Sequence, residues 1–421
     1  MLLKDTLLKV LEEARDKFSL ENIMRQQMER IPINRPVYIM ALGKAAYPMM
    51  KVFLSNVQSD SFVKFIEGLV ITPFGYAKEP LNKVTIVEAS HPLPDENSIK
   101  AADTAIDFLS KINKDDILFI LLSGGGSSLM EKPIDGFSLE DIINRTEELL
   151  KDGSSIDIIN AIRKKFSAVK GGKMLKYIKS QYIYIYAMSD VPGDNPRHIS
   201  SNPFLPQIEM VNDDRQIEKH HRFDNLTTRK FNVHDKAIMY RIIANNHSFC
   251  EAISESVLGI FPNLRRNKIH LISTYISGDS GKTGREIADL ASFIIKQKGR
   301  GFSAFVTPCL LIFGGETNVK VIGKGVGGRC TELALSAVEG LSRLTNCAIL
   351  TYATDGKDGN CEAAGAIVDC NTKAALLEKG IDIEKSLDNN DSYTALNAIG
   401  AIIPSEPTDI NVNDIVMLYV H

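Results

Sequence analysis

The sequence predicts an α/β protein of two domains, and two observations lead to that prediction. The chain has 421 residues, enough for two or three domains at about 150 residues each. Ile117 to Leu122 is continuously apolar, the pattern of a strand buried on both faces of a parallel sheet. This strand leads directly into three glycines, Gly124 to Gly126, and the rest of the prediction is organised around that junction.

Composition excludes several classes of protein. Hydrophobic residues make up 44% of the chain, charged residues 24%, and the mean hydropathy is −0.06, as in ordinary globular proteins. No apolar run approaches the roughly 18 residues of a membrane span, and the charged N-terminal segment is unlike a signal peptide, so we expect a cytoplasmic protein without a membrane partner. The net charge of −3 argues against a nucleic-acid partner. The six cysteines lack CxxC pairs and are expected to be reduced thiols.

The first half of the chain alternates between predicted helices and strands. A helix over residues 2–30 is ended by Pro32, and Asp95 is the expected N-cap of a helix that runs to Ile112. The other elements expected here are strands Val37 to Leu42, Gly68 to Thr72, Val84 to Ala89 and Tyr182 to Met188, and helices Ser138 to Leu150 and Ser155 to Phe166.

The second half begins with a polar stretch, residues 205–235, which predicts an exposed excursion or linker. Beyond it we expect a helix over Lys236 to Leu258, strands over Lys268 to Tyr275, Val319 to Ile322 and Ala348 to Ala353, and a helix over Arg329 to Arg343.

The glycine stretch has the composition of an anion-binding loop. Glycines without a Cβ atom can turn their backbone amides toward a ligand, and Ser123, Ser127 and Ser128 add hydroxyl donors. The loop therefore either binds a phosphate or carboxylate or simply makes a tight corner.

Three other chemically capable side chains follow predicted strands, where α/β sheets bind their ligands. Lys44 follows the first strand, although a solvated surface lysine fits the same spacing. His91 lies in a proline-fixed turn, where a histidine held by backbone groups is the common case. Asp190, in the loop Ser189 to Asp194, is suited to a metal or to proton transfer.

A basic run precedes the strand at Tyr182. Residues 163–173 hold five cations, and the two glycines beside Lys170 suit an approach to phosphates. A solvated helix face is the alternative explanation.

Two further glycine motifs suggest nucleotide binding of other kinds. Residues 276–283, ISGDSGKT, resemble a Walker A loop, but Ile276 stands where the first glycine is required. Residues 323–328, GKGVGG, satisfy GxGxxG between a predicted strand and a predicted helix, with Asp355 roughly where a ribose-binding acid would stand. A dinucleotide site is therefore a competing prediction, although Glu316 and Arg329 suit phosphoryl transfer better.

Taken together, these loops resemble the glycerate 2-kinases of the class that carries a MOFRL domain. The matching blocks follow the family order across nearly the whole chain. They are ALGKAA (41–46), SHPLPDENS (90–98), LLSGGGSSLM (121–130), RKKFSAVKGGK (163–173), SDVPGD (189–194), GGETNVKVIGKGVGGR (314–329), TDGKDGNCEAAGAIVD (354–369), NNDSY (389–393) and NVND (411–414).

The resemblance implies two α/β domains, a Rossmann-like N-terminal domain over residues 1–235 and a MOFRL domain over residues 236–421, with the active site in the interdomain cleft. It implies a kinase that uses ATP and Mg²⁺ to phosphorylate D-glycerate, usually at the 2-hydroxyl. Lys44, Arg329 and Asp355 match positions proposed to be catalytic in the family.

The remaining roles are assigned from the chemistry of phosphoryl transfer. We expect Lys44 and Arg329 to hold the transferring phosphoryl group, and Asp355, or alternatively Asp190, to act as base. Asp190 and Glu316 are the expected Mg²⁺ ligands. The candidate residues for binding substrate or phosphate are Ser123, Gly124, Gly125, Gly126, Ser127, Ser128, His91, Lys170 and Asn318.

Departures from the family pattern leave some details open. Cys330 and Thr331 replace polar residues of a GRNQE motif, Ser201-Asn202-Pro203 replaces an SGP-type turn, and Asp409 introduces a carboxylate near the C-terminus. Formation of 3-phosphoglycerate, an NAD(P)-dependent hydroxypyruvate reductase and a non-catalytic metabolite sensor remain alternatives. The sequence does not fix the oligomeric state, and a homodimer is kept open.

Overall fold

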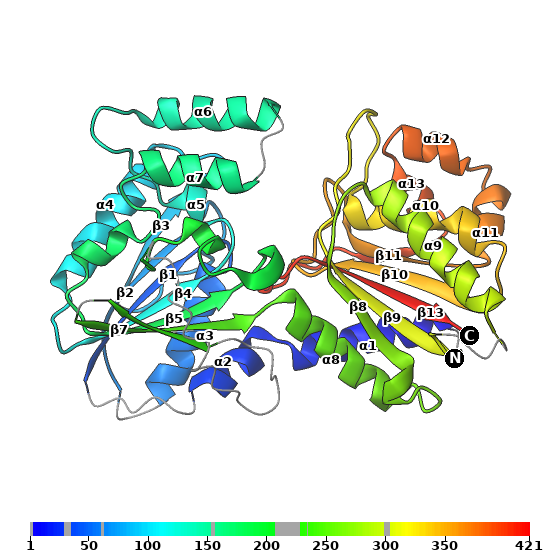
Figure 1. Cartoon of the computed structure of the whole chain (residues 1–421), viewed down its shortest axis with the longest axis horizontal. Helices are drawn as coiled ribbons and strands as arrows, with labels where there is room; N and C mark the ends of the chain where they lie inside the picture. Colours follow the sequence, from blue (N-terminus) through cyan, green and yellow to red (C-terminus); the bar gives the residue numbers. More distant parts are fainter. Residues whose placement is uncertain are drawn as a thin grey trace. The chain divides into compact units, whose positions relative to one another are not determined.

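The computed structural model describes residues 3–28, 35–59, 63–152, 156–206, 228–233, 235–298 and 304–421. These residues form two compact α/β units, which confirms the predicted fold class (Figure 1). The N-terminal unit is Leu20–Asn245, and the C-terminal unit combines Met1–Ser19 with Asn246–His421. The predicted domain boundary between residues 235 and 236 stays a prediction. In the part of the chain that the structure covers, no helix has the length and apolar character needed to cross a membrane.

The N-terminal unit is built on a seven-stranded sheet of order β3-β2-β1-β4-β5-β7-β6, in which only β6 runs antiparallel to its neighbour. The chain adds strands outward from β1 on one side and then from β4 on the other, so the order reverses between these two central strands. The strands are β1 (Pro36–Leu42), β2 (Lys64–Pro73), β3 (Val84–Ala89), β4 (Ile117–Leu122), β5 (Tyr182–Met188), β6 (Thr228–Val233) and β7 (Lys236–Ala244).

The register of the two central strands positions the loops that follow them. Leu42, the last residue of β1, is paired with Leu122, the last residue of β4. Because parallel strands end at the same sheet edge, the loops after β1 and β4 leave side by side. This is the point at which open α/β sheets usually bind ligands.

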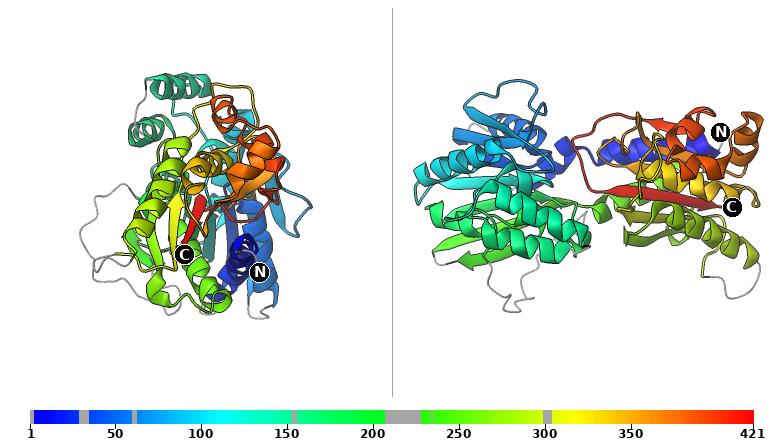
Figure 2. Two further views of the ribbon diagram at one scale, coloured as in Figure 1. Left: turned by 90° about the vertical axis from the view of Figure 1, so that its right-hand side faces the viewer. Right: turned by 90° about the horizontal axis from the view of Figure 1, so that it is seen from above.

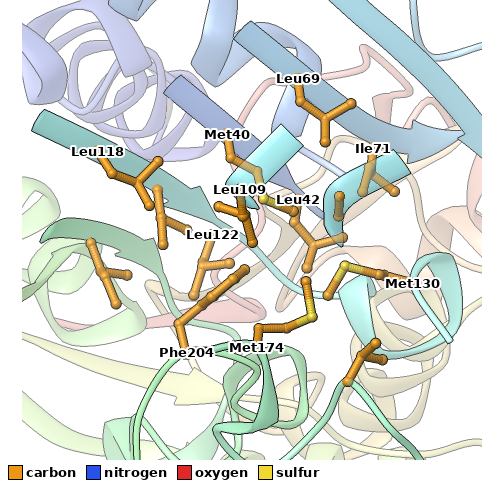
Figure 3. Packing of buried hydrophobic residues seen from close by; sticks show 14 of the residues in the cluster. Met40, Leu42, Leu69, Ile71, Leu109, Leu118, Leu122, Met130, Met174 and Phe204 are labelled. Carbon is orange, nitrogen blue, oxygen red and sulfur yellow. The ribbon is translucent and has the colours of Figure 1, made fainter. Parts of the chain in front are cut away.

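Alternate residues of the central strands pack on opposite faces of this sheet. Met40, Leu42 and Leu118 point into the core on the α4 side, which Figure 3 shows together with Leu109 of α4. Phe119 points to the other face, where its ring lies 4.9 Å from that of Phe53 in α3. The helices of this unit are α2 (Leu20–Met28), α3 (Ala46–Ser59), α4 (Glu96–Lys111), α5 (Gly126–Leu129), α6 (Leu139–Lys151) and α7 (Ile156–Phe166), with short 3₁₀ turns η1 (Lys173–Tyr177), η2 (Pro192–Asp194) and η3 (Ile199–Ser201).

The C-terminal unit contains a mixed six-stranded sheet of order β12-β11-β10-β13-β9-β8. Only β8 and β9 pair in parallel; the other neighbours are antiparallel. The strands are β8 (Ile269–Ile276), β9 (Cys309–Gly315), β10 (Cys347–Ala353), β11 (Ala363–Asp369), β12 (Ile402–Pro404) and β13 (Asp414–Val420).

Helices cover both faces of this second sheet, as the two views of Figure 2 show. On one face α9 and α10 pack closely. Gly284 of α9 allows this approach, since a Cβ atom there would lie only 2.1 Å from the carbonyl oxygen of Leu333 in α10. On the other face α1 packs against α8. The helices are α1 (Leu3–Lys17), α8 (Asn246–Ile260), α9 (Ser280–Lys296), α10 (Arg329–Leu341), α11 (Thr372–Glu378), α12 (Ile383–Asp388) and α13 (Ser392–Asn397), with the 3₁₀ turn η5 (Arg266–Lys268).

Some predicted elements were wrong. The helix predicted over Lys236 to Leu258 is the strand β7 followed by α8, because β5 and β6 offer β7 a partner on each side. The helix predicted over residues 2–30 is two helices, α1 and α2, that belong to different units. Part of the predicted linker over residues 205–235 is the strand β6. Residues 207–227 and 234 of that linker lie outside the described ranges.

Candidate active site

The glycine loop after β4 is shaped by its neighbours. Gly125 has φ of 84°, in the left-handed region, and a Cβ atom there would lie 3.0 Å from side-chain atoms of both Lys44 and His91. A Cβ atom at Gly124 would lie 1.8 Å from Oδ2 of Asp190. Three predicted site residues therefore lie directly against the loop, and only glycine leaves room for them.

The loops after β1 and β4 are held together by hydrogen bonds. The Lys44 amide donates to the carbonyl oxygen of Gly124 at 2.9 Å, and the Ala45 amide donates to Oγ of Ser123 at 3.0 Å. The predicted residues at the ends of β1, β3, β4 and β5 are thus brought to one place. We call this set the glycine-loop group: Lys44, His91, Ser123 to Ser128, and Asp190.

His91 is held neutral in this group. Its side chain is partly buried, and burial together with the Lys44 charge lowers its pKa to about 4. At neutral pH the imidazole therefore carries no charge and can donate one hydrogen bond and accept another.

Ser200 and Ser201 contact the same loop, although neither is among the site residues predicted from the sequence. The Ser200 hydroxyl donates to the carbonyl oxygen of Ser123 at 2.7 Å, and the Ser201 hydroxyl donates to Oγ of Ser127 at 2.8 Å. These serines and Asn202 have φ values of 49°, 58° and 52°, three non-glycine residues in succession in the left-handed region. Such strain is costly and is typical of functional sites. The only sequence signal was the altered SGP-type turn.

Lys170 lies beside the loop, but its charge is already neutralised. Its side chain is only 2% exposed and forms an ion pair with Glu131, which is 1% exposed. Since a buried pair of this kind is hard to separate, Lys170 has no free charge to offer a phosphate. Its predicted role in binding substrate or phosphate stays a prediction.

In the C-terminal unit, Arg329 is fixed by two carboxylates. Nε and Nη2 of Arg329 donate to Oδ2 and Oδ1 of Asp414 at 2.9 and 3.1 Å, while Nη1 donates to Glu316. The exposed fraction of the side chain is 6% for Asp414, 31% for Arg329 and 46% for Glu316, so it increases from Asp414 through Arg329 to Glu316. Asp414 is therefore a buried anchor, and the guanidinium edge near Glu316 faces solvent.

The sheet itself brings these acids together. Asp414, the first residue of β13, is paired with Gly315 of β9 and with Ala353 of β10. Glu316 follows β9 and Asp355 follows β10, so both leave the sheet at the edge where β13 begins. We call this set the arginine group: Glu316, Arg329, Asp355 and Asp414.

The arginine group shifts the pKa values of its own members. Burial raises the pKa of Asp414 to about 7, although Arg329 favours the ionised form. Burial disfavours the Arg329 charge, but Asp414 and Glu316 outweigh this effect and raise its pKa above the ordinary value. Arg329 is thus always charged, whereas Asp414 titrates near neutrality.

Asp358, like Asp414, is a buried acid whose role was not predicted from the sequence. Its buried carboxylate accepts hydrogen bonds from the amides of Cys330 and Thr331 at 3.0 and 2.8 Å, at the start of α10. An acid at a helix N-terminus stabilises the helix by offsetting its dipole. Asp358 thereby ties the loop that carries Asp355 to the helix that carries Arg329.

The GxGxxG segment does not have the structure of a dinucleotide-binding loop. The strand predicted over Val319 to Ile322 is absent from the described stretch 304–421, so that prediction was wrong. Every amide of the segment already has an acceptor: Oδ1 of Asn390 for Gly323, Oδ1 of Asn389 for Lys324, the carbonyl oxygen of Asn389 for Gly325, Oδ1 of Asp391 for Val326, Oδ1 of Asn360 for Gly327 and Oγ1 of Thr331 for Gly328.

The Walker-like segment is occupied in a similar way. Asp279 caps α9, and its carboxylate accepts the Lys282 amide at 2.7 Å, where a phosphate would lie in a true Walker loop. Asn318 lies next to this segment, where its backbone amide donates a hydrogen bond to the carbonyl oxygen of Gly278 at 2.7 Å. Its side chain is exposed, so Asn318 stays a candidate contact rather than part of a formed group.

The donor set bears on the expected Mg²⁺. Within the described ranges, no cluster of three or more His, Cys, Asp or Glu side chains could by itself hold a metal ion. Mg²⁺ bound through one or two carboxylates and substrate phosphates does not need such a cluster. Asp190 in the N-terminal unit and Glu316 in the C-terminal unit could each supply one such carboxylate.

Comparison with known proteins places this geometry in a family. Residues 3–233 match the family described as Domain of unknown function (DUF4147), and residues 309–414 match the MOFRL family. Glycerate 2-kinase of Pyrococcus horikoshii is 37% identical over 94% of this chain and 89% of its own length. D-glycerate 2-kinase of Thermotoga maritima is 33% identical over 99% of this chain and 98% of its own.

Two further similarities complete the comparison. The crystal structure of glycerate kinase from Thermotoga maritima superimposes with a TM-score of 0.84 at 32% identity, covering 100% of this chain and 99% of that one. A protein of Agrobacterium vitis named putative hydroxypyruvate reductase is 32% identical over 90% of this chain and 97% of its own. On the two family matches and the full-length kinase relatives, the chain belongs to the DUF4147/MOFRL family of glycerate 2-kinases, which are phosphotransferases.

Proposed function

We propose that this protein transfers the γ-phosphoryl group of ATP to the 2-hydroxyl of D-glycerate, giving 2-phosphoglycerate and ADP. The observation that carries the proposal is the bidentate Arg329–Asp414 pair beside Glu316 and Asp355. A kinase must neutralise charge on the equatorial oxygens of the transferring group, and a fixed guanidinium does this without reorganisation.

In the proposed reaction the 2-hydroxyl oxygen of glycerate attacks the γ-phosphorus, and the bond from that phosphorus to the β–γ bridging oxygen breaks. Asp355 accepts the hydroxyl proton, with Asp190 as the alternative base. Lys44 and Arg329 balance the charge of the transferring phosphoryl group. The glycine loop binds an anionic part of a substrate through amides and serine hydroxyls.

Mg²⁺ would supply further charge neutralisation on the phosphates. Asp190 and Glu316 are the residues proposed to hold the ion or its water ligands. Glu316 suits this role because it is 46% exposed, although it must then share its carboxylate with Arg329.

We also propose that the enzyme works in the cytoplasm. The six cysteines are all free, and five of them are buried, as expected of a protein from a reducing compartment. A homodimer remains an open prediction, to be tested by analytical ultracentrifugation.

Phosphorus NMR of the purified protein with ATP, Mg²⁺ and D-glycerate tests the function. We expect a 2-phosphoglycerate signal that grows with ADP. A 3-phosphoglycerate signal would keep the kinase and overturn the proposed orientation of glycerate. Phosphoryl transfer without either product would mean a different acceptor.

A hydroxypyruvate reductase is the second candidate, because the Agrobacterium vitis relative carries that name. The occupied amides of the GxGxxG segment argue against a pyrophosphate there. Oxidation of NADH or NADPH on addition of hydroxypyruvate, followed at 340 nm, would favour the reductase.

A further inference from the structure

A small pocket opens beside the glycine loop in the N-terminal unit. Its walls come from the turn after β3, from α5, from the helix pair α6 and α7, and from the basic run over residues 163–173. Its lining includes Leu93, Ser127, Glu131, Ile142, Arg163 and Lys170. The pocket is thus apolar on one side, and on the other it offers hydroxyl groups and one guanidinium.

Positive charge exceeds negative charge around this pocket. Glu131 is the one acid that lines it, and both of its oxygens are engaged: Oε2 by the Lys170 ammonium and Oε1 by the Lys132 amide at 2.9 Å. Arg163 is therefore left without a carboxylate of its own.

The other contacts of Arg163 do not neutralise it. Its one side-chain hydrogen bond to a described residue runs from Nε to Oγ1 of Thr146 at 3.5 Å, and no described carboxylate lies within ion-pair distance. Burial lowers its pKa, only partly offset by Glu131. Arg163 is partly buried, and because removing an unpaired charge from water is costly, this guanidinium favours an anion from outside the protein.

The size of the pocket limits the group that can enter it. Its volume is about 10 Å³, which is room for one water-sized group and not for a nucleotide. One end of a carboxylate is of that size. Ser127 is also suited to donate, because its Oγ accepts a hydrogen bond from Ser201 and its own proton is free for an acceptor.

We propose that Arg163 and Ser127 bind the carboxylate of the acceptor substrate in this pocket. The inference rests on the proposed function, which makes that substrate D-glycerate. According to this inference the glycine loop binds the acceptor substrate, through the Ser127 hydroxyl, rather than ATP. Arg163 is then the residue that makes the enzyme prefer a hydroxy acid to a neutral alcohol.

The test compares D-glycerate with D-glyceramide, its neutral amide, in wild type and R163M. Methionine keeps the apolar stem of the side chain and removes the charge. Because a hydrogen bond to a charged group contributes substantially to binding free energy, we expect kcat/KM for D-glycerate to be about 10- to 100-fold lower in R163M than in wild type. We expect kcat/KM for D-glyceramide and KM for ATP to stay within about twofold, since neither involves a carboxylate at Arg163.

R145M is the matched control. Arg145 is a cation of α6 with 53% side-chain exposure and an ion pair to Glu148, so its loss should change neither substrate. If R163M lowers activity toward the acid and the amide equally, Arg163 is structural and the inference is wrong. An unchanged preference for the acid would place the carboxylate elsewhere.

Calorimetry without ATP separates this inference from the proposed function. D-glycerate should bind wild type and R145M, and bind R163M about 10- to 100-fold more weakly. If wild type transfers no phosphoryl group but shows this pattern, the proposed function fails and the carboxylate site stands. Equal binding by R163M overturns the site. S127A, which removes only a hydroxyl, gives the same comparison if R163M does not fold.

Discussion

The guanidinium of Arg329 and the carboxylate of Asp414 face each other in parallel, with Nε–Oδ2 and Nη2–Oδ1 distances of 2.9 and 3.1 Å. Arg329 opens α10 and Asp414 opens β13, so this pair joins the helix to the end of the sheet. The fork geometry fixes the plane of the guanidinium, which a single lysine contact could not do.

The D414N variant should therefore lower kcat more than it raises KM for either substrate. Asparagine keeps the shape of the side chain but cannot accept both guanidinium bonds, so Arg329 loses its fixed orientation. Misplacement of this kind costs on the order of 100-fold in rate. Steady-state kinetics measure it, with D289N, at an exposed acid of α9, as the control. Equal loss of activity in both variants would contradict the assignment.

The same variant should change how stability depends on pH. Asp414 has a folded pKa of about 7 against an ordinary value of 3.8. The folded state therefore holds this proton more tightly than the unfolded state between these values, and the free energy of unfolding falls as pH rises from about 4 to about 7. D414N removes this contribution. Urea unfolding at pH 5 and pH 7.5 should show a smaller decrease for D414N than for wild type.

His91 should remain neutral across the physiological range. Its folded pKa of about 4 lies below the ordinary 6.5, so its contribution to stability is complete above pH 6.5 and is lost as pH falls toward 4. NMR of the His91 ring protons should show no titration between pH 6 and 8. In K44M the His91 pKa should rise but stay below 6.5, because burial is the larger cause. A wild-type midpoint near 6.5 would mean that the ring is solvated.

Gly125 and Gly136 form a matched pair for testing the glycine loop. Both have positive φ, 84° and 87°, but a Cβ atom meets Lys44 and His91 at Gly125 and nothing within 4 Å at Gly136. Alanine should destabilise either position by about 1 kcal/mol through backbone strain. Only G125A should also reduce kcat/KM, by about tenfold or more, because it displaces both side chains. Similar kinetics for the two variants would remove the loop from the site.

Asp355 and Asp190 can be told apart by their response to Mg²⁺. D355N should lower kcat by about 100- to 10,000-fold at any Mg²⁺ concentration if Asp355 is the base. D190N should instead raise the Mg²⁺ concentration needed for half-maximal rate and recover much of kcat at saturation. The reverse pattern would exchange the two roles.

The apolar runs of the sequence predicted most of the N-terminal unit, whereas in the C-terminal sheet they predicted only the strands β8 and β10. Ile117–Leu122 is buried along its whole length, as its pattern indicated, because a central parallel strand is covered on both faces. Lys236–Ala244 fits a helix as well as a strand, because a short apolar stretch is compatible with both periodicities, and only its pairing with β5 and β6 decides for a strand. Val319 to Ile322 was the opposite case, since strand-forming residues there find no partner.

By itself the sequence determined which residue types follow four of the strands: Lys44, the glycine loop, Asp190 and Asp355. Each of these residues follows an apolar run that ends in glycine or acidic residues, and such a pattern can be recognised within a few positions of the sequence. Only the tertiary structure decided that Asp414 anchors Arg329, that Glu131 neutralises Lys170, and that Arg163 is left unpaired. The partners in the first two pairs lie 85 and 39 residues apart along the chain, and such pairings depend on how sheets and helices pack rather than on any local pattern.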